Sequence, residues 1–357
     1  MEKVRTRDFI HTTDDLFFAS TNYTHPEDRY ISFLRYIPNP KGDREKNETR
    51  YSKVSSEEAY SYLRENYPEY LYFCENTQIE MMGVPLTKVK QIIKPEERLK
   101  EIKKSYDSGN NNEIIKKLID IADFFHFKAG IDYKNLGISG SILPGLQKKE
   151  ISDIDFVIYG LQNHRQAIAT FKKYHNKEIN INGRKIILNK IEDNFWQKVY
   201  EKRMRDSSLS KEEFFWYENR KFNRGLIRGT LFDILATRNY DEITESWNDT
   251  KYEPIGTSKI ECVIEDALRS FDNPAIYKIK NLKVIEGINE NISEIASFTH
   301  TYAGEVVENE EVVAKGKIEK VMKVGCEDSY RLVVGTTRES IDEYVKLKDS
   351  PIINKKE

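Results

Sequence analysis

One segment of this 357-residue chain constrains the fold more than any other. In residues 136–159, a glycine-serine turn is followed by two aspartates one residue apart. The flanking stretches are apolar and β-branched, which predicts two strands joined by a short helix. Because side chains alternate along a strand, Asp153 and Asp155 share one face, and Ile154 and Phe156 share the other. The segment therefore predicts two carboxylates a few ångströms apart at the start of a buried strand.

Such a pair of carboxylates repels itself unless a cation lies between them, and oxygen ligands of this kind suit Mg²⁺. The preceding turn adds the complementary chemistry. Gly140 has no side chain, so backbone N–H groups near it can approach an anion, and the hydroxyl of Ser141 is a further donor. A helix beginning near Ile142 would direct its positive N-terminal end at the same point. Together these features predict a site for a metal-bound triphosphate.

A third carboxylate is expected from Asp233, which is alone within the apolar run 229–236. A charge in such a run is unfavourable unless it is paired or coordinated. The preceding segment 219–228 carries four positive charges and no acid, which suits phosphate binding. Arg228 has the best claim, because it lies five residues before Asp233. Two plainer alternatives stay open: Asp233 pairs with Arg228 or caps a helix, and the basic run is a solvated helix face.

The segment resembles the DNA polymerase beta-type nucleotidyltransferase superfamily, and most closely its archaeal-type predicted nucleotidyltransferases. The resemblance rests on Gly140-Ser141, on Asp153-x-Asp155 between apolar residues, and on a lone Asp in a later strand. It implies transfer of a nucleoside monophosphate from an NTP or dNTP to an acceptor. It further implies that Asp153, Asp155 and Asp233 are the catalytic residues and hold Mg²⁺ or Mn²⁺, and that Gly140 and Ser141 bind the β and γ phosphates.

The expected fold class is α/β and α+β, with several domains. A central nucleotidyltransferase domain with a small mixed sheet and helices, residues 96–249, is flanked by an N-terminal α+β region, residues 1–95, and a C-terminal β-rich, barrel-like domain, residues 250–357. Within these, a capping box at Ser55 and Glu58 predicts a helix to about residue 66, and other helices are expected over 95–106, 114–125 and 260–270. Strands are expected over 294–302, 311–324 and 330–334.

Composition excludes several classes of protein. The net charge of −2 argues against a globally basic nucleic-acid coat protein, although Lys and Arg outnumber Asp and Glu in residues 96–249. No apolar run approaches the roughly 18 residues that span a bilayer, and the charged N-terminus shows no signal peptide, so we expect a cytoplasmic protein without a membrane partner. Three widely separated cysteines fit neither a disulfide framework nor a zinc site. The oligomeric state is left open.

The leading hypothesis is a Mg²⁺-dependent nucleotidyltransferase that uses two metal ions, with RNA or another nucleic acid as the favoured acceptor. A second hypothesis is a non-catalytic nucleic-acid-binding or interaction protein that keeps the fold. A third is transfer to a small molecule or to a protein. The structural criterion is whether the carboxyl groups of Asp153, Asp155 and Asp233 converge beside the Gly140-Ser141 turn. An Asp233 far from the other two would favour binding without catalysis.

Overall fold

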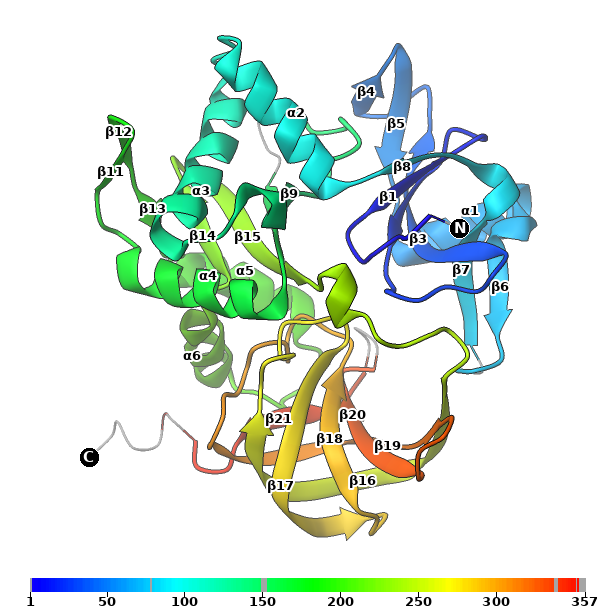
Figure 1. Cartoon of the computed structure of the whole chain (residues 1–357). Coiled ribbons are helices and arrows are strands. Elements are labelled where there is room, and N and C mark those ends of the chain that lie inside the picture. Colours follow the sequence, from blue (N-terminus) through cyan, green and yellow to red (C-terminus); the bar gives the residue numbers. More distant parts are fainter. Residues whose placement is uncertain (1, 78, 149–152, 337–339, 351, 353–357) are drawn as a thin grey trace. The chain divides into compact units, whose positions relative to one another are not determined.

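The structure, a computed structural model, describes residues 2–77, 79–148, 153–336, 340–350 and 352 (Figure 1). The chain forms two compact units. The first comprises residues 1–189 and 223–248, and the second comprises residues 190–222 and 249–357. Residues 190–222, which fall in the expected 96–249 domain, group with the C-terminal residues. The three-part division at residues 95 and 249 stays a prediction.

The fold class expected from the sequence is wrong. We expected a central nucleotidyltransferase domain with a small mixed sheet and helices, but the described part of the chain is strand-rich, with 38% strand and 26% helix in several large sheets. Within those residues the sheets have eight, five, two and six strands. The physical reason is that long alternating segments at both ends of the chain form strands that bury side chains on one or both faces.

The first unit begins with the eight-stranded sheet, in the order β4-β5-β3-β2-β1-β8, with β7 paired to β3 and to β6. Its strands, drawn in blue in Figure 1, are β1 (Phe9–Thr12), β2 (Phe17–Ser20), β3 (Arg29–Pro38), β4 (Arg44–Lys46), β5 (Thr49–Lys53), β6 (Leu71–Cys74), β7 (Ile79–Pro85) and β8 (Val89–Ile93). The neighbours Phe17 and Phe18 point to opposite faces and are both buried, in different clusters. Both faces of this sheet are therefore covered.

The described residues of the first unit form four α-helices: α1 (Ser56–Asn66), α2 (Pro95–Asp107), α3 (Glu113–Ala129) and α4 (Leu161–Tyr174). The predicted capping box of α1 is confirmed, since Ser55 and Glu58 each accept a hydrogen bond from the other's backbone N–H. The side chain of Asn112 caps α3 through the N–H of Ile114. Local capping and helical spacing thus account for the first three helices, close to the predicted ranges.

The five-stranded sheet of the first unit has the order β13-β14-β15-β10-β9. Its strands are β9 (Leu136–Ile138), β10 (Ile154–Tyr159), β13 (Leu188–Asn189), β14 (Arg224–Ile227) and β15 (Thr230–Thr237), and a separate hairpin joins β11 (Ile179–Ile181) to β12 (Arg184–Ile186). Phe156 of β10 contacts Phe125 of α3 with ring centroids 5.6 Å apart, and Phe232 of β15 contacts Phe171 of α4 at 5.4 Å. One face of the sheet therefore packs on α3 and α4, and the residues that alternate with Phe156 and Phe232 point to the other face.

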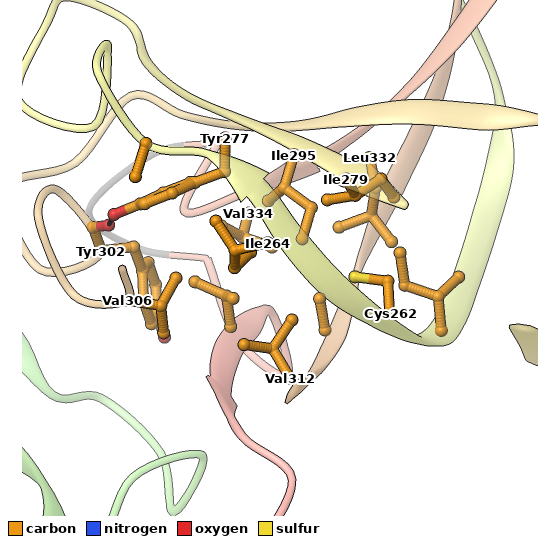
Figure 2. Packing of buried hydrophobic residues seen from close by; sticks show 14 of the residues in the cluster. Cys262, Ile264, Tyr277, Ile279, Ile295, Tyr302, Val306, Val312, Leu332 and Val334 are labelled. Atoms are coloured by element: carbon orange, nitrogen blue, oxygen red, sulfur yellow. Dashed lines mark hydrogen bonds between the residues drawn. The ribbon is translucent and has the colours of Figure 1, made fainter. Parts of the chain in front are cut away.

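The second unit combines α5 (Asp193–Arg203) and α6 (Lys211–Lys221) with a six-stranded sheet. The strands are β16 (Thr250–Asp266), β17 (Ala275–Gly287), β18 (Ile292–Ser297), β19 (Glu311–Lys323), β20 (Ser329–Val334) and β21 (Tyr344–Leu347). β16 pairs with both β17 and β19, so the sheet curls round on itself. Figure 2 shows the buried side chains of these strands meeting inside the curve, with Tyr277 lying against Tyr302.

The helix expected over residues 260–270 is also wrong. Those residues belong mainly to the long strand β16, in which Ile260, Cys262 and Ile264 are buried at a spacing of two. The same strand begins at Thr250, and it pairs with β19 along most of its length. Taken alone, the short apolar segment fits both the helical and the strand period. Pairing with the neighbouring strands makes it a strand.

Candidate functional site

Asp155 and Asp233 lie side by side on adjacent strands. β10 and β15 are parallel, and their register pairs Asp155 directly with Asp233. Residues paired in this way point to the same face of a sheet, with strands about 4.8 Å apart. Both side chains are on the face opposite Phe156 and Phe232, away from α3 and α4. The strand register alone therefore brings these two predicted site residues together.

The Gly140 turn lies against the carboxylate of Asp155. β9 pairs with β10, and the N–H of Ser139 donates to the backbone oxygen of Asp155 at 2.9 Å. Gly140 has a left-handed φ of +62°, and a Cβ placed there would lie 1.8 Å from Asp155 Oδ2. The carboxylate thus occupies the space that any side chain at residue 140 would fill, so this approach requires glycine.

Asp153 precedes β10 and is exposed. Partial desolvation, followed by the like charge of Asp155, raises the pKa of Asp153, and the positive charges of Arg224 and Lys53 act against the rise. The negative charge of Asp155 therefore acts on Asp153. A cation between them would relieve this repulsion, which is the property expected of a divalent-metal ligand pair.

The guanidinium of Arg224 holds Asp233. Arg224 of β14 pairs in register with Asp233, its Nε lies 2.7 Å from Oδ1, and its Nη2 donates to Oδ2 at 3.1 Å. Both side chains are largely buried, with 16% and 15% exposed. A two-point contact of this kind is the strongest geometry for an arginine and a carboxylate. Among the residues that the structure describes, no group of three or more His, Cys, Asp and Glu side chains is close enough to hold a metal ion.

Residues 140–146 form turns rather than the predicted helix. The N–H of Leu146 donates to the oxygen of Ser141 at 2.8 Å, and the N–H of Gly145 donates to that of Ile142 at 3.2 Å. The expected contribution of a helix N-terminus from near Ile142 is therefore wrong. Phosphate binding at Gly140 and Ser141 would rely on individual N–H groups and the Ser141 hydroxyl. Residues 149–152, between this turn and Asp153, lie outside the described residues.

Arg228 lies elsewhere in the first unit. It occupies the turn of the β14–β15 hairpin with a φ of +45°, and its guanidinium pairs with Glu113 at 3.1 Å and Asp120 at 2.8 Å. The hairpin places Arg224, not Arg228, opposite Asp233. The sequence analysis missed Arg224 because linear spacing favoured the nearer arginine. Counting outward from the Arg228-Gly229 turn would have identified the correct residue.

The cations of the basic run 219–228 are divided between the two compact units. In the second unit, Arg220 pairs with Glu310 at 2.6 Å. Lys221 is 3% exposed and donates to Glu218 and to the backbone oxygen of Thr301. These two residues therefore stabilise the second unit from within. Arg224 is the member of the run that contacts a predicted site residue.

Comparison with known proteins identifies one relative over nearly the full length. The chain is 42% identical over 356 residues to "Uncharacterized protein MJ1086" of Methanocaldococcus jannaschii, covering 97% of this chain and 99% of that protein. The chain belongs to the family of that protein. The similarity covers both compact units.

Other comparisons add no further relative. No family model matches the chain. No solved structure matches it. Within the described ranges, the chain has no helix with the length and apolar character needed to cross a membrane.

Proposed function

We propose that the protein is a nucleotidyltransferase, which transfers a nucleoside monophosphate from an NTP or dNTP to an acceptor and depends on Mg²⁺ or Mn²⁺. The observation that carries the proposal is the contact of Asp155 with the Gly140 turn, with Asp233 beside it in register. The proposal includes RNA as the favoured acceptor and a cytoplasmic location, where nucleoside triphosphates are available. A small molecule or a protein as the acceptor remains a variant of the same proposal.

Each residue of the site has a role in this proposal. Asp153 and Asp155 would hold the divalent cation, and Asp233 would join them when Arg224 releases its carboxylate. A cation bound there supplies charge stabilisation to the attacking and leaving oxygens of an in-line displacement. Gly140 leaves room for the Asp155 carboxylate beside the turn, and N–H groups of the turn with the Ser141 hydroxyl would bind the substrate phosphates. The chain then acts mainly by positioning and by charge, as phosphoryl transfer requires.

One observation favours the non-catalytic alternative. The ion pair between Arg224 and Asp233 engages the carboxylate that would complete the metal site. If this pair persists when substrate binds, the protein binds a nucleotide or a nucleic acid without turnover. The same arginine can also contact phosphate oxygens, since guanidinium groups bind phosphate and carboxylate in the same two-point manner. Catalysis therefore requires that Arg224 leave Asp233 when substrate binds. An activity assay reports whether this happens.

The test is transfer of label from each of the α-labelled NTPs, with Mg²⁺ or Mn²⁺ and a mixture of cellular RNA. We expect labelled product from the wild-type protein and at least a 100-fold loss in Asp155→Asn. Asp132→Asn is the matched control, because Asp132 is exposed and pairs only with Lys134 among described residues. Nucleotide binding without label transfer in the wild type would favour the non-catalytic alternative. A wild-type protein that transfers no label and binds neither nucleotide nor RNA would refute both.

A further inference from the structure

The N-terminal sheet presents one of its faces to the loop that follows Gly140. Phe17 and Tyr36 are fully buried on this face and pack in one cluster with Leu143 and Leu146 of the loop. The opposite face packs on α1 through a different cluster. The loop between the site's glycine and residue 146 is therefore part of the core of this sheet.

Polar contacts fix the same two parts to each other. Arg44 donates to the backbone oxygen of Leu146 at 2.5 Å, and Lys46 donates to that of Pro144 at 2.7 Å. The hydroxyl of Ser139 donates to the backbone oxygen of Arg7 at 2.8 Å. These bonds join residues 98 to 132 positions apart in the chain. The sheet and the Gly140 turn therefore cannot shift independently.

The strand register extends this face to Lys53. Phe17 pairs with Tyr36, and Tyr36 pairs with Lys53 across β2, β3 and β5. Directly paired residues point to the same face, so the Lys53 ammonium is on the face that covers the loop. Unlike Tyr36, Lys53 is exposed. The sheet thus places an accessible cation beside a buried tyrosine at the edge of the site.

Electrostatics agree with this placement. Burial raises the pKa of the Tyr36 phenol, Arg44 and Arg35 oppose the rise, and the charge of Asp155 adds to it. The positive charge of Lys53 likewise acts on the carboxylate of Asp153. Residues of the N-terminal sheet and the two aspartates are therefore close enough for their charges to act on each other.

We propose that Lys53 is a substrate-binding residue of this site and that it contacts the polyphosphate chain of the bound nucleoside triphosphate. This inference rests on the proposed function. The carboxylates alone would repel a triphosphate, and the Gly140 turn supplies no charge. Lys53, on a strand beside both, adds a positive charge to those of the divalent cation and Arg224, as a compact donor that suits phosphate. The N-terminal sheet thereby becomes part of the nucleotide site rather than a separate module.

The experiment measures the dissociation constants of ATP, inorganic pyrophosphate and AMP for the full chain in Mg²⁺ at fixed salt. Lys53→Ala should weaken ATP and pyrophosphate binding about tenfold or more and leave AMP binding within about twofold. Lys53→Arg should restore most of the loss. The matched control is Arg50→Ala, because Arg50 is an exposed cation on the same strand whose odd spacing from Lys53 places it on the other face.

The outcomes separate the two proposals. Equal ATP binding by wild type and Lys53→Ala, or an equal loss for AMP and ATP, overturns the role of Lys53 and leaves the proposed function standing. A loss as large in Arg50→Ala overturns it as well, because a general charge effect would then account for the result. If the wild-type protein binds neither ATP nor pyrophosphate, the proposed function itself fails. Unfolding midpoints in urea confirm that each variant is folded.

Discussion

Replacing Gly140 with alanine tests whether Asp155 is held where transfer would require it. The new Cβ would lie 1.8 Å from Asp155 Oδ2, and real Cβ atoms essentially never approach other heavy atoms closer than 3.0 Å. The carboxylate must therefore retreat by about 1.2 Å, the difference between these distances. A displacement of about 1 Å in a reacting group lowers rates about 100-fold. We expect a loss of this size in label transfer from NTP, measured at saturating Mg²⁺.

The left-handed backbone adds a separate effect on stability, which a second glycine isolates. A φ near +60° costs an alanine about 1–2 kcal/mol relative to glycine. Gly145, in the same loop, has a φ of +75° and nothing within 4 Å of its ideal Cβ. Gly145→Ala should therefore lower the free energy of unfolding in urea by this backbone cost of about 1–2 kcal/mol. Its activity should stay within a few-fold of wild type. If Gly140→Ala is as active as Gly145→Ala, Asp155 is not a catalytic residue and the reasoning is refuted.

Three further predictions concern stability. Burial raises the pKa of Asp8 to about 7, so the folded state holds a proton that the unfolded state releases above about pH 4. The free energy of unfolding should therefore fall by up to about 1.4 kcal/mol per pH unit between these values. Urea unfolding at pH 5 and 7 should show a smaller fall for Asp8→Asn than for wild type. An equal fall in both proteins would contradict this. Burial raises the pKa of Glu305 well above its usual range, and neither carboxyl oxygen has a hydrogen-bond partner among described residues. Glu305→Gln should thus raise the melting temperature at pH 8 and change it little at pH 4.5, whereas a lower value at pH 8 would show a charged carboxylate. Gly225→Ala would place a Cβ 2.5 Å from Phe171 and 2.6 Å from Phe232, so we expect about 1–3 kcal/mol of destabilisation in urea, and an unchanged value would show that the rings can move apart.

Features with a local physical cause could be predicted from the sequence. The capping box at Ser55 and Glu58 and the apolar spacing in 114–125 correspond to α1 and α3. The strand containing Asp155 was expected from its alternating, β-branched residues and is β10. Each of these depends on residues within one or two turns of each other. Period and capping are sufficient there because no distant contact competes with them.

Features set by distant contacts could not be predicted in the same way. The apolar residues around Ile260 form a strand because β16 pairs with β17 and β19. Arg224 is an exception, because the hairpin turn at Arg228 that places it opposite Asp233 is local and can be counted from the sequence. Lys53 reaches the site through packing between residues about 100 positions apart in the chain. Single-sequence reasoning contains no information about such pairings.

The central claim is that Asp153 and Asp155 bind a divalent cation beside the Gly140 turn. The most direct measurement is a crystal structure of the protein with Mn²⁺ and a non-hydrolysable NTP analogue, read by the anomalous scattering of manganese. We expect an anomalous peak about 2.1–2.2 Å from carboxylate oxygens of both aspartates, the distance typical of hard divalent cations with oxygen ligands. We also expect substrate phosphates against Gly140 and Ser141. A structure with the analogue bound elsewhere, or with no manganese between the two aspartates, would contradict this claim.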